Sequence, residues 1–244
     1  MEENVLILGA TSDMAVAIAR QLAQEGYSIT LAARNTERLS ALEGDLRVRF
    51  KAMVTCARFD ALDYASHQEF YDSLPEKPDV VICVFGLLGD QRQAQEDWQH
   101  CADIINSNYT GAVSILNVVA NDFERRRKGV IIGISSVAGE RGRQSNYIYG
   151  SAKAGFTAYL SGLRNRLYHS GVHVVTVKPG FVKTKMIENL PTPGPLTAAP
   201  KTVAKKISAA IRRRPNTVYV LPIWRLVMLV IRTIPESIFK KLKL

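Results

Sequence analysis

Short runs of β-branched and aliphatic residues recur along the chain, and longer segments with helical spacing separate them. These runs show little of the apolar–polar alternation of a half-exposed strand. Uninterrupted apolar strands are typical of a parallel sheet that helices cover on both faces. The pattern therefore predicts an α/β fold built on a parallel sheet. The runs occupy residues 5–8, 29–33, 80–85, 130–134 and 172–177, and two further strands are expected over residues 50–59 and 218–221.

The segments between these runs are long enough to form the helices that connect parallel strands. Residues 14–25, 36–46 and 147–168 have apolar residues at helical spacing. An alternation of strands and crossover helices gives the doubly wound, Rossmann-type arrangement of three layers, α/β/α. A chain of 244 residues lies at the upper end of one-domain sizes. We therefore expect one domain over residues 1–244.

The cysteines and the N-terminus bear on the compartment of the protein. Cys56, Cys83 and Cys101 are scattered without C-x-x-C or metal-ligand spacing, so we expect free thiols and no metal site. The N-terminal residues lack the basic start and apolar core of a secretory signal. We therefore expect a cytosolic protein.

The net charge of +10 comes from the C-terminal part of the chain. Residues 201–244 hold eleven lysines and arginines against one acid, whereas residues 1–200 hold 21 of each sign. Residues 222–244 form a basic, amphipathic tail whose apolar run is too short and too charged to span a bilayer. We expect this tail either to lie on the anionic inner face of a membrane, or to pack on the protein's own core or on a second subunit.

Residues 183–200 form the segment least compatible with regular structure. Four prolines and a glycine fall within it, and these residues break helix and sheet alike. We expect a loop that acts as a substrate lid.

The first strand leads directly into a turn of small residues and then into a helix. The turn includes Gly9, Thr11, Ser12, Asp13 and Met14. Backbone N–H groups at a helix N-terminus attract phosphate, so this turn is a candidate site for a dinucleotide pyrophosphate. An ordinary strand–helix turn capped by Ser12 or Asp13 would explain the same residues.

The residues that follow the second and third strands are candidates for contact with adenosine. Arg34 stands where an NAD-selective fold offers an acid to the ribose 2′-hydroxyl. A cation there can pair with a 2′-phosphate, which favours NADP(H) over NAD(H). A solvated arginine is the alternative. Asp60, with Ala61 after it, would face the adenine edge or would cap a helix.

A phenol and an ammonium lie four residues apart at Tyr149 and Lys153, which makes them neighbours on one helix face. A tyrosine that gives its proton to a forming alkoxide has an ordinary pKa near 10, so a nearby cation is needed to stabilise the phenolate. The spacing therefore suits a general acid and its supporting charge.

Two further polar residues fit the same chemistry. Ser136 ends the strand over residues 130–134, and strand C-termini line the ligand crevice of a parallel sheet. Asn108 lies within a long helical pattern, where its amide could hold a water that carries protons toward Lys153. An ordinary strand-end serine and a helix-bending asparagine are the alternatives.

Together these residues resemble the short-chain dehydrogenase/reductase family over essentially the whole chain. Asn108, Ser136, Tyr149 and Lys153 match the catalytic tetrad of that family in order and approximate spacing. Residues 179–184 resemble its P-G-x-x-x-T segment, and the resemblance implies contacts with the nicotinamide. The cofactor residues that it adds are Phe85, Gly86, Pro179, Gly180, Val182 and Thr184, beside Tyr149 and Lys153.

Two departures from the family pattern concern the cofactor end. Cys83-Val84-Phe85-Gly86 stands where the family usually has N-N-A-G, and Asp13 and Ala15 replace two glycines. Asp13 puts an anion near the pyrophosphate unless its side chain turns away.

A narrower resemblance is to decaprenylphosphoryl-2-keto-pentose reductases, carried by residues 59–63, 85–90, 138–141 and 234–242. It implies reduction of a keto sugar on a polyprenyl phosphate. The expected function is reduction of a small or lipid-linked ketone with NADP(H), by a homo-oligomer with peripheral membrane contact. A Rossmann-type binding protein without turnover and a membrane-surface protein are the alternatives. The basic tail holds few aromatic residues and no recognised motif for nucleic acid, so we expect no such partner.

Overall fold

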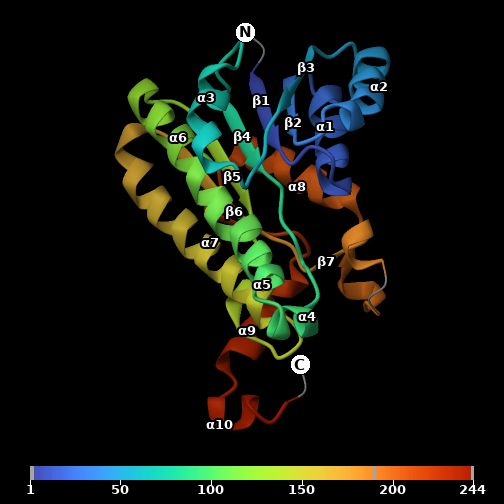
Figure 1. Ribbon diagram of the computed structural model, residues 1–244, viewed down its shortest axis with the longest axis vertical. Coiled ribbons are helices and arrows are strands. Elements are labelled where there is room, and N and C mark those ends of the chain that lie inside the picture. Colours follow the sequence, from blue (N-terminus) through green and yellow to red (C-terminus); the bar gives the residue numbers. More distant parts are fainter. Residues whose placement is uncertain (1–2, 189–190, 243–244) are drawn as a thin grey trace.

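The computed structural model describes residues 3–188 and 191–242 of the chain. In this part of the chain, seven parallel strands form one sheet in the order β3-β2-β1-β4-β5-β6-β9 (Figure 1). The predicted α/β fold with a parallel sheet is confirmed. The strands are β1 (Asn4–Leu8), β2 (Ser28–Ala33), β3 (Val54–Arg58), β4 (Val80–Cys83), β5 (Val130–Ile134), β6 (His173–Lys178) and β9 (Thr217–Tyr219).

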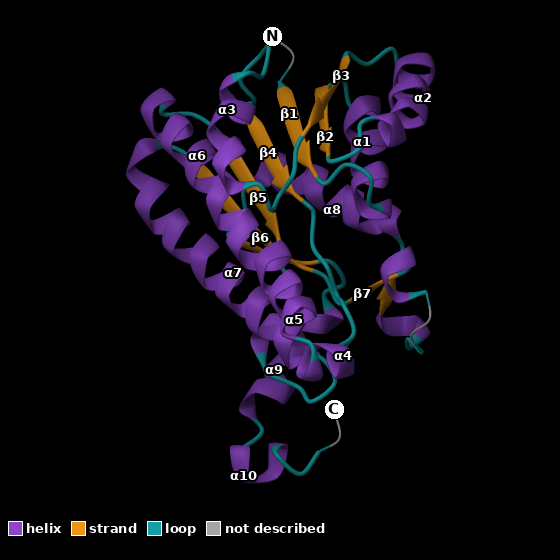
Figure 2. Cartoon of the chain, viewed as in Figure 1, coloured by secondary structure: helices purple, strands orange, loops and turns teal. Residues whose placement is uncertain are grey.

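Helices cover both faces of the sheet, as the uninterrupted apolar strands predict. Side chains of β1 alternate between the faces: Val5 and Ile7 pack in one apolar cluster, Leu6 and Leu8 in the other. Figure 2 shows the three layers. The first cluster is closed by α1 (Asp13–Gln24), α2 (Ser40–Phe50) and α8 (Pro200–Arg213), and the second by α3 (His67–Asp72), α6 (Gly111–Arg126) and α7 (Tyr147–Leu167).

Several element boundaries differ from the sequence prediction. The expected strand over residues 50–59 begins only at Val54, because α2 continues through Phe50 and ends at Lys51 with a left-handed φ of 54°. The expected strand over residues 80–85 ends at Cys83, so Phe85 and Gly86 lie in the loop after it.

The connections carry shorter helical segments. Two α-helices, α4 (Gln91–Glu96) and α5 (Trp98–Ile105), follow β4 and lie at the carboxyl end of the sheet (Figure 1). The remaining short segments are η1 (Glu37–Leu39), η2 (Tyr64–Ser66), η3 (Asn106–Thr110), η4 (Val137–Glu140), η5 (Tyr168–Ser170), η6 (Lys185–Ile187) and η7 (Gly194–Leu196).

The order of the strands reverses at β1, which pairs with β2 on one side and with β4 on the other. The connection after β1 crosses one face of the sheet, and the connection after β4 crosses the other face. A crevice therefore opens between the two connections at the carboxyl ends of these strands. Ligands bind at such a switch point in open α/β sheets.

The segment expected to act as a lid has some regular structure. Residues 189–190 of it lie outside the described residues. Strand β7 (Phe181–Val182) pairs with β8 (Thr197–Ala198) in a separate two-stranded sheet, which brings both ends of the segment together. Pro191 and Pro193 lie in irregular chain and Pro195 in η7. Pro200 is the first residue of α8, where a missing N–H costs nothing.

The tail forms α9 (Ile223–Thr233) and α10 (Glu236–Phe239), and residues 243–244 lie outside the described residues. One face of α9 packs on the protein, because Trp224 and Met228 are buried against Val137 and Phe181. The opposite face is open to solvent, with Leu226 63% and Val230 56% exposed. Within the described part of the chain, every helix is too short or too polar to cross a membrane.

Candidate active site

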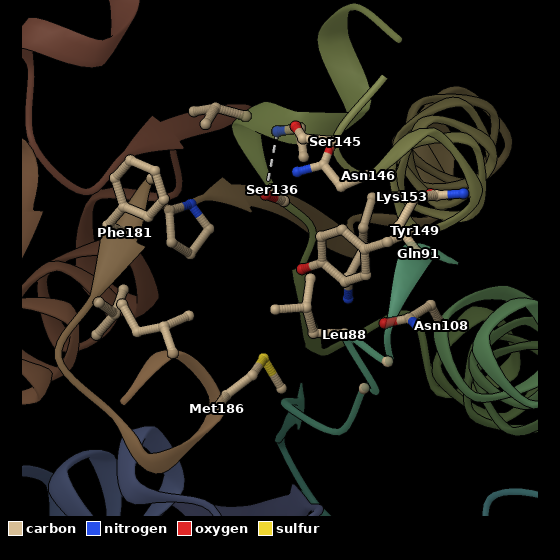
Figure 3. Close-up of a pocket in the computed structure, with 18 of the residues that line it drawn as sticks. Leu88, Gln91, Asn108, Ser136, Ser145, Asn146, Tyr149, Lys153, Phe181 and Met186 are labelled. Carbon is tan, nitrogen blue, oxygen red and sulfur yellow. Dashed lines mark hydrogen bonds between the residues drawn. The ribbon is translucent and has the colours of Figure 1, made fainter. Parts of the chain in front are cut away.

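A cavity of about 890 Å³ lies at the carboxyl ends of β4, β5 and β6. The four residues predicted to act in catalysis all line it: Asn108, Ser136, Tyr149 and Lys153 (Figure 3). They come from η3, from the end of β5 and from α7, so only the folded chain brings them to one place.

Tyr149 and Ser136 face the cavity from two segments in close contact. A Cβ on Gly150 would come within 2.9 Å of the Ala138 carbonyl, and one on Gly139 within 2.7 Å of the backbone N of Ala154. These glycines therefore let η4 pack directly on α7. The Ser136 hydroxyl accepts a hydrogen bond from the Ala138 N–H at 3.1 Å. Burial raises the pKa of Tyr149 to about 12, and its hydrogen bond with Ser136 acts in the opposite direction.

Lys153 is a buried cation next to the phenol. Its Nζ atom donates to the carbonyl of Ile134 at 3.0 Å and lies 5.8 Å from the centre of the Tyr149 ring. The side chain is 4% exposed, and burial lowers its pKa to about 8. The ammonium is therefore still the main form at neutral pH, although its burial is costly.

Asn108 occupies a π-helical turn, η3, between α5 and α6. Such turns are frequent at functional sites. Its amide nitrogen donates to the carbonyls of Leu87 and Ile104, whereas its buried Oδ1 atom has no protein partner among the described residues. A Cβ on Gly86 would lie 2.5 Å from this oxygen and 3.3 Å from the Lys153 Nζ atom. The amide oxygen and the ammonium therefore lie on the same side of Gly86.

The turn between β1 and α1, which the sequence predicts to bind phosphate, is tightly packed at Gly9. Gly9 has a left-handed φ of 87°, and a Cβ there would clash with the backbone of Phe85. Ser12 caps α1 by accepting from the Ala15 N–H at 3.2 Å. Asp13 instead accepts from the Lys185 N–H at 2.8 Å, so its carboxylate turns toward the lid segment. Thr11 and Met14 complete this turn.

The predicted adenosine contacts lie beyond the cavity along the same sheet edge. Arg34 follows β2 and is exposed, with no hydrogen bond or ion pair to any described residue. Asp60 follows β3, accepts from the Leu62 N–H at 3.0 Å and forms a tight turn with Ala61. Neither residue is a helix cap.

The predicted nicotinamide contacts line the cavity opposite Tyr149. A Cβ on Gly180 would overlap the indole of Trp224, so this glycine makes room for α9 beside the cavity. The Trp224 indole N–H donates to the Leu196 carbonyl at 3.0 Å, which ties α9 to the lid segment. The other predicted residues that line the cavity are Met14, Phe85, Gly86, Pro179, Val182 and Thr184.

The remaining wall residues were not among the site residues predicted from the sequence, although Met186 lies in the segment expected to act as a lid. Leu88, Phe181 and Met186 form an apolar side, and Figure 3 places Asn146 next to Tyr149 on the polar side. In the sequence, the polar residues of this wall resemble ordinary surface residues, so no sequence pattern identifies them as site residues. The polar side also includes Gln91, Arg143 and Ser145.

Comparison with known proteins identifies a family for the chain. The model of the family described as short chain dehydrogenase matches residues 3–193. An uncharacterized oxidoreductase of Streptomyces coelicolor is 36% identical over 248 residues, covering 98% of this chain and 95% of its own length. One of Mycobacterium tuberculosis is 34% identical over 241 residues, covering 98% and 96%.

A solved structure supports the fold. The short-chain dehydrogenase from Sphingobium yanoikuyae in complex with NADPH superimposes with a TM-score of 0.82 at 22% identity, covering 96% of this chain and 97% of that chain. The chain therefore belongs to the short-chain dehydrogenase family and is an oxidoreductase acting on CH–OH or carbonyl groups.

Proposed function

We propose that this protein reduces a ketone to an alcohol with NADPH, using Tyr149 as the general acid. The observation that carries the proposal is the convergence of Tyr149, Ser136, Lys153 and Asn108 on one cavity at the switch point of the sheet. Burial of an ammonium beside a phenol destabilises the fold. Such a cost is expected where the ammonium has a catalytic role, and it is not expected in a binding protein without turnover.

The residues along the sheet edge fit a nicotinamide dinucleotide. Gly9 leaves room at the N-terminus of α1, where N–H groups and the helix dipole favour phosphate. The ribose and nicotinamide would lie toward Lys153, Val182 and Thr184. When bound, the cofactor supplies the hydride that the carbonyl carbon receives.

The protein's own residues handle the carbonyl oxygen and its proton. Ser136 and Tyr149 donate hydrogen bonds to the oxygen, which positions it and stabilises the negative charge that develops there. Tyr149, which is protonated at neutral pH, then transfers its proton to the forming alkoxide. Burial raises the pKa of Tyr149 to about 12 and so opposes this transfer unless a cation stabilises the phenolate. The Lys153 ammonium stabilises the phenolate that remains. Asn108 holds a water on its unpartnered oxygen, and this water returns a proton toward Lys153.

We also propose a preference for NADPH over NADH, because Arg34 is an exposed cation at the end of β2 that has no hydrogen-bond or ion-pair partner among the described residues. A 2′-phosphate would provide a charge-assisted partner for it.

Loss of absorbance by NADPH in the presence of a panel of ketones tests the function. Tyr149→Phe removes only the transferable proton, so the rate should fall by about 10²- to 10⁴-fold while NADPH affinity, measured by fluorescence, stays within about twofold. Turnover close to that of the wild type would exclude Tyr149 as the acid.

More specifically, we propose that the substrate is a keto sugar on a polyprenyl phosphate, which the protein binds at the inner face of the membrane. The supporting observation is the open apolar face of α9, including Leu226 and Val230, on a helix whose other face reaches the cavity through Trp224. Arg225 and Arg232 flank this face. Association of two or more copies of the chain stays a prediction.

A further inference from the structure

The cavity contains most of the buried polar atoms that lack a partner. Among the described residues, such atoms occur on Gln91, Asn108, Glu140, Arg143 and Asn146, and all of these except Glu140 line the cavity. Burying a polar group without a hydrogen bond lowers the stability of the folded protein. Each of these atoms therefore needs an explanation, and a bound ligand that supplies the missing partner is one. The proposed proton path uses Asn108 and leaves the other three unexplained.

Arg143 is a half-buried cation that forms no ion pair with any acid among the described residues. Its Nε atom has no acceptor, and an Nη2 contact of 3.7 Å to the thioether of Met228 is a weak one. Glu140 acts electrostatically on Arg143, but among the described residues no ion pair joins the two. The Oε1 atom of Glu140 is engaged by Tyr219 at 2.7 Å and by Lys178 at 3.2 Å, and its Oε2 atom lies 3.6 Å from Arg232. The guanidinium therefore offers charged donors to the cavity.

Gln91 and Asn146 offer a complementary donor and acceptor. The Gln91 side-chain oxygen accepts from the Ile148 N–H at 3.1 Å, which fixes the side chain at the N-terminus of α7 and leaves its NH₂ group free. Asn146 has a free side-chain oxygen, and it lies three residues before Tyr149. A hydroxyl group can accept from an amide N–H and donate to an amide oxygen at once.

We propose that Gln91, Arg143 and Asn146 form a substrate subsite, hereafter the polar subsite, that recognises a hydroxylated ketone bearing an oxyanion. The Arg143 guanidinium binds the carboxylate or phosphate of this substrate, and the two amides bind its hydroxyl. This inference rests on the proposed ketone reduction, because Tyr149 fixes where the carbonyl lies.

Matched pairs of ketones test the role of Arg143. Levulinate and methyl levulinate differ in a carboxylate, and dihydroxyacetone phosphate and dihydroxyacetone differ in a phosphate. Calorimetric titration into the Tyr149→Phe variant saturated with NADPH should show tighter binding of the charged member of at least one pair. The pair that responds identifies which oxyanion the subsite takes.

Arg143→Gln in the same background should reduce this preference by about 10- to 150-fold, since it replaces a charge-assisted pair. Arg143→Lys keeps the charge and should restore part of it. Arg92→Gln is the matched control, because Arg92 is an exposed arginine on the rim of the same cavity. If the protein binds both members of each pair equally, the subsite assignment is wrong. The assignment is also wrong if the preference for the charged member persists in Arg143→Gln.

The hydroxyl contacts are tested with dihydroxyacetone against acetone. Gln91→Leu and Asn146→Leu should each reduce the preference for the hydroxylated ketone by about 3- to 10-fold, the worth of a neutral hydrogen bond. An unchanged preference in both variants would overturn this part.

The wild-type protein distinguishes the two proposals. If it oxidises NADPH with neutral ketones but binds both members of each pair equally, the reduction stands and the polar subsite falls. If it binds the charged members tightly through Arg143 but oxidises no NADPH, the proposed function falls.

Discussion

The Asp13 carboxylate accepts a hydrogen bond from the backbone N–H of Lys185 at 2.8 Å, across 172 residues of sequence. Asp13 begins α1, where the cofactor pyrophosphate is proposed to bind, and Lys185 begins η6 in the lid segment. The contact gives Asp13 a partner away from the phosphate position. It also joins the segment predicted to act as a lid to the proposed cofactor site.

Asp13→Ala should tighten NADPH binding and loosen the lid. Removing this anion removes a like-charge repulsion with the cofactor phosphates, which between exposed groups is worth about 1 kcal/mol or less, or at most about 5-fold in affinity. Trypsin should cleave faster after the exposed Lys183 and Lys185. Fluorescence titration and timed proteolysis measure the two effects. Unchanged cleavage would mean that Asp13 does not hold the lid.

Lys153→Met should abolish most activity and yet stabilise the fold at neutral pH. Burial lowers the pKa of Lys153 from 10.5 to about 8, which corresponds to a cost of about 3 kcal/mol for keeping it charged. Loss of the hydrogen bond to the Ile134 carbonyl offsets about 1 to 2 kcal/mol. The net gain of about 1 to 2 kcal/mol raises the Tm by about 2 to 8 °C.

The pH dependence of this gain has a definite sign. Between pH 8 and 10.5 the unfolded chain binds a proton at Lys153 that the folded protein does not. Wild-type stability at this residue therefore increases with pH in that window. The Tm difference between Lys153→Met and the wild type should shrink as the pH rises from 8 and reverse sign before pH 10.5, where only the lost hydrogen bond to Ile134 remains, as measured by scanning fluorimetry. A constant difference would show that it arises from packing.

Arg34→Ala should weaken NADPH far more than NADH. A charge-assisted pair with the 2′-phosphate contributes about 1.5 to 3 kcal/mol, which is about 10- to 150-fold in affinity. Arg38→Ala is the control, because Arg38 is an exposed arginine four residues further along. Equal losses for both cofactors would mean that Arg34 does not select the phosphate.

The protein should sediment with anionic vesicles at low salt through the open face of α9. Replacing Leu226 and Val230 with Glu removes at least about 2 kcal/mol of apolar burial, about 30-fold in partitioning. Val48→Glu is the control, because Val48 is 82% exposed on α2. Raising the salt should release the wild type, since each basic residue contributes about 1 kcal/mol that salt screens. Wild-type protein that stays in the supernatant contradicts the membrane proposal.

The sequence by itself predicted the fold and the residues that carry the proposed chemistry. Strand and helix periodicity is a local property, so the parallel sheet and its two helical layers could be predicted from runs such as residues 130–134. Tyr149 and Lys153 are neighbours on one helix by spacing alone. The sequence predicted the ends of helices and strands less accurately than their type. For example, β3 begins at Val54, because α2 extends further than its apolar pattern.

Only the tertiary structure decided how distant residues meet. The Asp13–Lys185 contact, the face of α9 that packs on Val137 and the unpartnered oxygen of Asn108 each depend on segments far apart in the chain. The polar side of the cavity is decided in the same way. From the sequence alone, a polar residue such as Arg143 or Asn146 is expected to be solvated. It becomes a candidate for binding substrate only when the folded protein buries it and offers it no hydrogen-bond partner.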